Sequence, residues 1–304
     1  MATQTNMKKP QLAIMNAVHD LPVLVARDEG YFKDEGLDIE FVTTPGMAQV
    51  TTSHMVKFDS VFDRPLDSVY NEGGIDQYRM CEWGIMKRAV EAETEGLRGR
   101  KIVALGASMS SFAIVVTRDS DAYEPEQLKD KAIAVTPNNG SHFTTLKMME
   151  GFLTPEHIKT TNAGTMLKRI EALRAGKVAA VSLMEPWISV AQKMGLRILI
   201  ESHSTRSEAA GDDLDGPTLA AMFRAQARAV KRLEKDPTPY AHYLTAETGG
   251  LLEPSELQTW RLLHAPPQPY TRERFEDTYN WTVKWNMVVP GATYENIVDN
   301  RAWA

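Results

Sequence analysis

The chain has 304 residues, of which 43% are hydrophobic and 24% charged, and its formal net charge at pH 7 is −6. This composition is that of an ordinary globular protein, which excludes a disordered or fibrous chain. Lys and Arg form no long run, which argues against a nucleic-acid partner, and the apolar stretches are too short for membrane insertion. At about 150 residues per domain, the length predicts two lobes.

The chain contains a single cysteine, Cys81, which excludes an internal disulfide and a cysteine-rich zinc site. Two interpretations of this residue remain open: a buried apolar side chain or a reactive thiol. The sequence has no pair of histidines at metal-ligand spacing, no Gly-rich phosphate loop and no nucleophile elbow. We therefore predict no bound metal, nucleotide or other cofactor.

The first third of the chain alternates between strand and helix patterns. A β-compatible run at 11–16 precedes helical spacing at 23–28, and residues 38–43 alternate as a second strand, which predicts a β-α-β unit. His19 is expected in the loop between the first strand and its helix. Further elements are expected as a helix from Pro65 to Gly73-Gly74, a strand at 75–80, a helix at 85–94 and a strand at 101–105.

The second half continues the alternation and then becomes helical. Strands are predicted at 112–117, 132–136, 179–183 and 197–202, with helices at 143–152, 166–175 and 188–194. Beyond Gly216 the spacing predicts four helices at 218–233, 238–248, 253–263 and 272–286.

The segment from Asn139 to His142 opens a predicted helix directly after a strand. A helix start with Gly140 and Ser141 presents free backbone N–H groups and a partial positive charge, which suits a carboxylate, sulfonate or phosphate. This is the strongest local argument for an anionic ligand, although a purely structural cap is the alternative.

Four segments together resemble the alkanesulfonate-, nitrate- and thiamine-pyrimidine-binding group of type II periplasmic binding proteins. They are EGYFKDEGLDIE at 29–40, VVTRDS at 115–120, residues 128–136 with the following Gly140-Ser141, and ALRAGKVAA at 172–180 running on to Glu185-Pro186-Trp187. Together, the segments span nearly the whole chain, and their order and spacing are those of the family.

The resemblance implies an α/β fold of two lobes joined by two crossover strands, with a central ligand cleft. Lobe I would comprise residues 1–108 and 204–304, including a helical C-terminal tail, and lobe II residues 109–203. The family contains transporter receptors and also cytoplasmic enzymes: a pyrimidine synthase of thiamine biosynthesis, a desulfinase of aromatic sulfur metabolism and aromatic decarboxylases. The fold therefore does not decide the function.

Candidate catalytic residues follow the first strands and the loops between them. His19, Cys81 and Glu82 lie where open α/β sheets bind ligands, beyond the carboxyl ends of strands. His54 is a candidate because the desulfinase-like enzymes place a functional histidine in a similar region. Their cysteine, however, lies in the first loop, where this chain has Ala17-Val18-His19, and the cysteine cluster of the thiamine synthase is absent. Neither mechanism transfers intact.

Candidate ligand-binding residues come from both predicted lobes. Strand alternation places Arg79 on the face of Cys81, where it could hold a carboxylate or sulfinate. The alternative is that Arg79 pairs with a surface acid. Trp187 could stack on an aromatic ligand or pack between lobes. The full predicted set is Arg79, Ser110, Asn139, Gly140, Ser141, His142, Glu185 and Trp187.

These observations favour a cofactor-free lyase acting on a small anionic aromatic or heterocyclic acid. The N-terminal residues show no apolar secretory segment, so the cytoplasm is the expected location, or the periplasm if a leader has been removed. The alternative is a non-catalytic binding protein of an ABC-type uptake system or a sensor, with a transporter permease as its partner.

Overall fold

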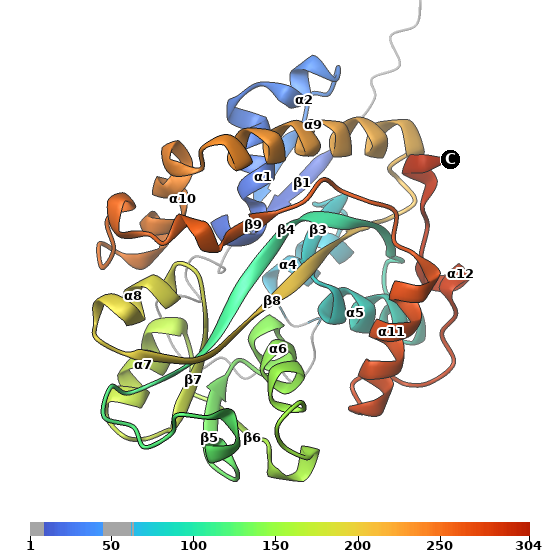
Figure 1. Ribbon diagram of the computed structural model, residues 1–304. Coiled ribbons are helices and arrows are strands. Elements are labelled where there is room, and N and C mark those ends of the chain that lie inside the picture. Colours follow the sequence, from blue (N-terminus) through green and yellow to red (C-terminus); the bar gives the residue numbers. More distant parts are fainter. Residues whose placement is uncertain (1–8, 45–61, 63) are drawn as a thin grey trace, which may run out of the picture.

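The structure is a computed structural model that describes residues 9–44, 62 and 64–304 (Figure 1). Within these residues, nine strands form one mixed sheet in the order β2-β1-β3-β8-β4-β7-β5-β6, and β9 pairs with β4. The strands are β1 (Gln11–Ile14), β2 (Glu40–Thr43), β3 (Gln77–Cys81), β4 (Lys101–Val116), β5 (Ala132–Val135), β6 (Lys159–Asn162), β7 (Ala180–Met184), β8 (Arg197–Ala210) and β9 (Leu262–His264).

Helices cover both faces of this sheet. They are α1 (Ala17–Asp28), α2 (Tyr31–Asp34), α4 (Pro65–Asn71), α5 (Glu82–Thr94), α6 (Gly140–Met149), α7 (Met166–Arg174), α8 (Trp187–Lys193), α9 (Gly216–Lys235), α10 (Ala241–Thr245), α11 (Arg272–Lys284) and α12 (Tyr294–Ile297). Among the described helices, none combines the length and the apolar composition that a membrane span requires.

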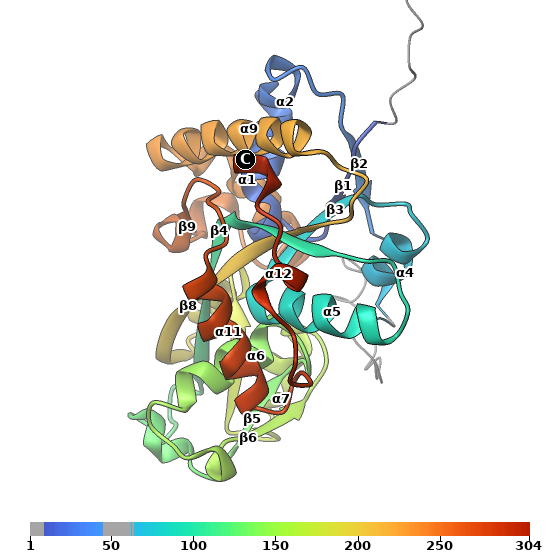
Figure 2. The ribbon, with the colours of Figure 1, turned by 90° about the vertical axis from the view of Figure 1, so that its right-hand side faces the viewer.

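The long antiparallel strands β4 and β8 divide the molecule into two lobes. One end of the pair borders β3, β1 and β2, and the other end borders β7, β5 and β6 (Figures 1 and 2). Strands expected separately at 101–105 and 112–117 are a single strand, because β8 pairs with both parts and a register shift between Leu105 and Met109 absorbs the residues between them. The predicted two-lobed α/β architecture is confirmed, and the proposed boundaries at 108 and 203 fall inside β4 and β8.

The first β-α-β unit forms as predicted, with β1 and β2 parallel. Its helix, however, begins at Ala17, before the predicted 23–28 segment, because the side chain of Asn16 caps it by accepting a hydrogen bond from the backbone N–H of His19. His19 therefore lies in the first turn of α1 and not in a loop.

The C-terminal tail is less helical than its sequence suggests. The amphipathic helix α9 packs on α1 and α2, as expected of a helix with one apolar face. The predicted helix at 253–263 is instead two 3₁₀ turns followed by β9, which pairs with β4 at Ser108, Met109 and Ser110. The predicted helix at 238–248 is interrupted as well, since only Ala241–Thr245 is α-helical. Strand pairing in the middle of the crossover thus overrides the local helical spacing.

Candidate functional site

A cavity of about 40 Å³ lies between the lobes, beside the crossover strand β8. By volume it holds roughly three ordered waters, or the charged head group of a small acid. The ends of β1 and β3 and the first turns of α1, α4, α5 and α6 enclose it. Its lining residues are Met15, His19, Arg64, Leu66, Met80, Cys81, Gly84, Arg88, Asn138, Asn139, Gly140 and Arg206.

Arg206 on β8 supplies a buried cation to this cavity. The side chain is fully buried, and its Nη1 donates to Ser204 Oγ at 3.1 Å. Its Nε and Nη2 atoms have no hydrogen-bond acceptor, and no carboxylate of a described residue forms an ion pair with it. Burial lowers the pKa of Arg206 to about 10 and outweighs the opposing effect of nearby acidic groups. The guanidinium therefore remains charged at neutral pH. Among the described residues, Arg206 thus has no counter-ion.

Arg79 on the neighbouring strand β3 is also buried but has partners on two sides. It forms ion pairs with Asp20 of α1 and Glu208 of β8 and donates to the carbonyl of Ala13 at 3.1 Å. The β3–β8 register places Arg79 opposite Glu208, and Cys81 opposite Arg206. Arg79, which was predicted to bind the ligand, thus forms ion pairs with two carboxylates and is not among the residues that line the cavity.

His19 faces the cavity as a neutral imidazole. Burial, followed by the charges of Arg206 and Arg79, lowers the pKa of His19 well below its usual value. Its Nδ1 lies 2.9 Å from the side-chain amide nitrogen of Asn16, the residue that caps α1. An imidazole in these surroundings is a poor source of a proton at neutral pH.

Cys81 lies at the end of β3 and is almost fully buried in the cavity wall. Burial raises the pKa of its thiol and outweighs the lowering effects of Arg206, the Gly84 backbone, Arg88 and Arg64. The side chain is therefore a neutral thiol at neutral pH, placed directly opposite Arg206 in the sheet. Both sequence-based interpretations retain support, since Cys81 is buried and also lines the cavity.

The start of α6 approaches the cavity through Asn139 and Gly140. A Cβ atom on Gly140 would lie 3.3 Å from the Phe112 ring, so a glycine permits this close approach. Ser141 and His142 do not line the cavity: Ser141 Oγ accepts from the Thr136 N–H at 3.0 Å, and His142 Nδ1 accepts from the Asn138 N–H at 3.3 Å. Burial lowers the pKa of His142 to about 4. Half of the predicted helix-start site thus reaches the cavity.

The remaining predicted site residues lie elsewhere. Glu82 accepts hydrogen bonds from Arg274 and lies in a separate surface recess, because it begins α5 instead of ending β3. Glu185 is fully buried and bonds to Ser189 and Arg261. Ser110 is buried on β4, Trp187 packs in the core of the protein, and His54 lies outside the described residues.

Arg206 was missed because the strand prediction stopped at 202. A strand continued to Ala210 would have placed Arg206 and Glu208 on one face by simple alternation, and would have shown an arginine entering the cleft. Within the described parts of the chain, no three His, Cys, Asp or Glu side chains are grouped as metal ligands would be.

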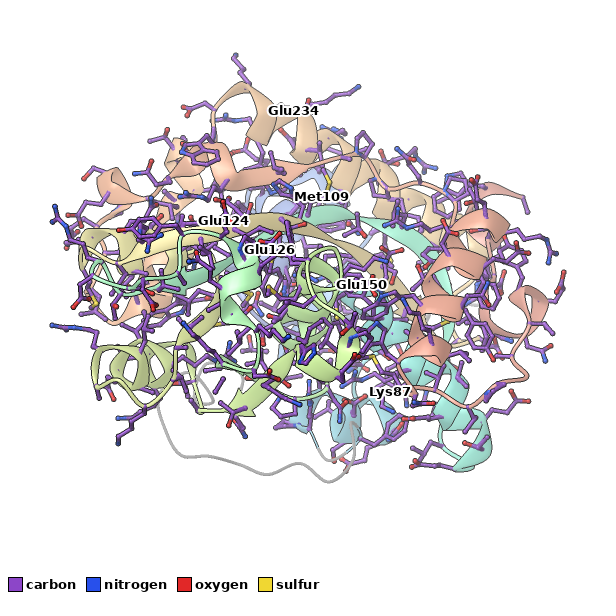
Figure 3. All side chains as sticks on the ribbon, turned by 60° about the horizontal axis from the view of Figure 1, so that its bottom comes forward. Lys87, Met109, Glu124, Glu126, Glu150 and Glu234 are labelled. Atoms are coloured by element: carbon purple, nitrogen blue, oxygen red, sulfur yellow. The ribbon has the colours of Figure 1, made fainter. Side chains whose placement is uncertain are left out.

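Two contacts join the lobes around the cavity. Arg64, at the start of α4, donates to the carbonyls of Pro137 and Asn138 at 3.1 and 2.8 Å. At the outer edge, Glu150 follows α6 and accepts from the indole N–H groups of Trp281 and Trp285 on and beside α11, at 2.8 and 3.1 Å (Figure 3). The Arg64 contacts lie just before the first turn of α6, and the Glu150 contacts lie at its C-terminal end.

Comparison with known proteins identifies the fold. No family model matches the chain, and no curated protein matches its sequence. Solved structures do match. The alkanesulfonate-binding protein SsuA from Xanthomonas axonopodis pv. citri, bound to MOPS, is 17% identical over 92% of this chain and 94% of its own, with a TM-score of 0.68.

Two further matches differ in function from SsuA. The periplasmic nitrate-binding protein NrtA from Synechocystis PCC 6803 is 12% identical over 98% of this chain and 88% of its own, with a TM-score of 0.65. The desulfurization enzyme DSZB is 12% identical over 97% of this chain and 98% of its own, with a TM-score of 0.61. The chain therefore has the type II periplasmic binding protein fold, as its sequence predicted. Both binding proteins and an enzyme share this fold.

Proposed function

We propose that this protein binds a small organic monoanion, a carboxylate or sulfonate, with its charged group against Arg206 in the cavity between the lobes. The observation that carries the proposal is that no described residue provides a counter-ion for Arg206. Transferring an unpaired charge from water to a protein interior costs several kcal/mol. A bound anion would restore the pairing and satisfy the two guanidinium nitrogens that lack acceptors.

The surroundings of Arg206 add donors and exclude competing charge. The first turn of α6, with Gly140 in the lining, contributes the positive end of a helix. The carboxylates of Asp20 and Glu208 form their ion pairs with Arg79 and not with Arg206. The cavity holds a head group only, so the rest of the ligand requires the lobes to separate or extends out of the cavity. Two structural neighbours, an alkanesulfonate-binding and a nitrate-binding protein, bind anions as well.

A second candidate function is a lyase that removes the anionic group. It is favoured by one observation: the neutral thiol of Cys81 lines the same cavity as Arg206. For a carboxylate substrate, the C–C bond breaks to release CO₂, and the carbon takes a proton from the thiol, which regains one from water. The neutral His19 and the Arg274-bound Glu82 are less suited to that role. As a receptor, the protein would instead pass an unchanged ligand to a transporter permease.

A ligand screen tests both functions together. Thermal unfolding is followed with benzoate, methanesulfonate and related aromatic, heterocyclic and aliphatic acids, each beside its neutral amide or sulfonamide. We expect stabilisation by anions and none by the neutral analogues. Equal stabilisation by both members of a pair would contradict the proposed role of Arg206.

Mass spectrometry of each stabilising ligand after incubation separates binding from catalysis. A ligand recovered intact supports a receptor, and a ligand that has lost CO₂ or its sulfur group supports a lyase. In the latter case, Cys81→Ala is expected to abolish product formation while leaving ligand affinity within about twofold, since the thiol carries no charge at neutral pH. Cys81→Ser, which keeps a hydroxyl, is the matched variant.

A further inference from the structure

We infer that Asn16 is a positioning residue that fixes His19 in the Nε2-protonated tautomer, which makes His19 a neutral hydrogen-bond donor for the bound anion. This inference rests on the proposed function for the identity of the acceptor, but the tautomer itself does not depend on any ligand.

The orientation of the Asn16 amide is settled by the helix that it caps. Its Oδ1 accepts the backbone N–H of His19 at 3.0 Å, which is the usual hydrogen bond of an N-cap residue. Its Nδ2, which can only donate, therefore faces His19 Nδ1 at 2.9 Å. Exchanging the two amide atoms would break the N-cap hydrogen bond, since it would point the NH₂ group at a backbone N–H.

The tautomer of His19 follows from this orientation. Because Asn16 donates to Nδ1, that nitrogen must be unprotonated, and the single proton of the neutral ring lies on Nε2. Protonating both nitrogens would set two donors against each other beside two arginines, Arg206 and Arg79. Nε2 has no hydrogen bond to any described residue, and the ring lines the cavity, so its N–H is available to a ligand.

The pairing of one cation with one neutral donor defines the ligand class more closely. Arg206 supplies a positive charge, and His19 supplies a second hydrogen bond without adding charge. Arg64 and Arg88 line the same cavity, and Arg88 is paired with Asp67. The pair of Arg206 and His19 suits an anionic group with at least two acceptor oxygens, namely a carboxylate, sulfinate or sulfonate. Around His19, the other ionisable groups are Arg64, Arg79, Cys81, Arg88 and Arg206 of the cavity region and Asp20 of α1.

Two substitutions separate capping from tautomer control. Asn16→Asp and Asn16→Ser both preserve a side-chain acceptor for the cap of α1, so the helix should persist in both. Asn16→Asp replaces the donor at Nδ1 with an acceptor, which moves the proton to Nδ1 and turns Nε2 into an acceptor that repels an anion. Asn16→Ser removes the Nδ1 partner and adds no charge. Asn138→Asp adds the same charge to the cavity lining without touching the Asn16–His19 pair.

The tautomer is read by long-range ¹H–¹⁵N correlation spectra of the ¹⁵N-labelled full chain without ligand, with His19 assigned from a His19→Gln variant. Wild type and Asn138→Asp are expected to carry the proton on Nε2, and Asn16→Asp on Nδ1. A wild-type proton on Nδ1, or a ring charged at pH 7, would overturn the inference.

Titration calorimetry with benzoate and methanesulfonate tests the donor role. We expect at least a tenfold loss of affinity in Asn16→Asp, a smaller loss in Asn16→Ser, and a benzoate affinity in wild type that is constant from pH 6 to 8. Unchanged affinity in both Asn16 variants would overturn the donor role while leaving the proposed function intact. Failure of wild type to bind either anion would contradict the proposed function for these probes, and the spectra would still decide the tautomer.

Discussion

Arg79 and Arg206 lie on adjacent strands, with 2% and 0% of their surfaces exposed, yet their ion pairing differs. Arg79 is opposite Glu208 and also meets Asp20, so its charge is neutralised within the fold. Arg206 is opposite the neutral thiol of Cys81 and has no acid partner among the described residues. Arg206 is thus two positions along β8 from Glu208, the partner of Arg79. Within this distance the strand pair holds one arginine that is paired in the fold and one that is available to a ligand.

The difference indicates how such a site can be maintained in a stable protein. Buried charges are tolerated where they are paired, and breaking a pair costs more than never burying it. The Arg79 cluster fixes α1 and β8 against β3, and so holds His19 and Arg206 in place at the cavity. One arginine therefore stabilises the scaffold, and the other is left for the ligand.

Among the variants that test this comparison, Arg79→Met is expected to have the largest effect on stability. It leaves Asp20 and Glu208 buried without a cation, and we expect the free energy of unfolding to fall by about 3–5 kcal/mol. Urea denaturation followed by circular dichroism measures the change. If Arg79→Met is as stable as wild type, the two arginines do not differ in the way described.

Glu185 extends the comparison to a buried carboxylate whose cation, Arg261, is shared with a second carboxylate. Burial raises the pKa of Glu185 to about 7 and outweighs the opposing hydrogen bonds from Ser189 and the charge of Arg261. Arg261 lies 3.4 Å from Glu185 and also forms an ion pair with Glu201. Because the folded pKa lies above the usual 4.5, the stabilising contribution is complete below about pH 4.5 and is lost as the pH rises through about 7.

Glu185→Gln is expected to remove this pH dependence, which amounts to about 3 kcal/mol for such a shift. The free energy of unfolding is measured from pH 5 to 8.5. Glu234→Gln, on the exposed surface of α9, is the control that should keep the wild-type profile (Figure 3). A profile shared by wild type and Glu185→Gln would show that Glu185 is already ionised in the fold.

Glu150 tests the contribution of a contact between the lobes. Glu150→Ala removes the hydrogen bonds that Glu150 accepts from the Trp281 and Trp285 indoles. It also removes the ion pairs with Lys147 and Lys284. We expect affinity to fall about fivefold, equivalent to roughly 1 kcal/mol. The loss should be similar for every ligand, since Glu150 lies outside the cavity. A loss confined to one ligand would place Glu150 in the binding site instead, and titration calorimetry with benzoate and methanesulfonate distinguishes the two results.

The sequence predicted the architecture well because its signals are local and repeated. Strand and helix periodicities, Gly stops and the four family-like segments identified the two lobes and the start of α6 at Asn139 and Gly140. His19 and Cys81 were also predicted near the cavity from their places after strands.

The sequence could not predict which arginine is free. That property depends on strand register and on Asp20, which reaches Arg79 only because Asn16 caps α1 earlier than the helical spacing indicates. The strand β9 was missed for a related reason, since its partner is the middle of the long crossover strand and not a neighbouring segment of the chain. Pairing between distant residues decided both outcomes.

Arg206→Met tests the central claim most directly. Urea unfolding of wild type and Arg206→Met is compared with and without benzoate or methanesulfonate. We predict that the variant without anion is at least as stable as wild type, because an unpaired charge has left the interior, and that neither anion stabilises it. A variant that loses several kcal/mol without anion, yet is stabilised by the anions as wild type is, would show that Arg206 is paired within the fold and is not the anion site.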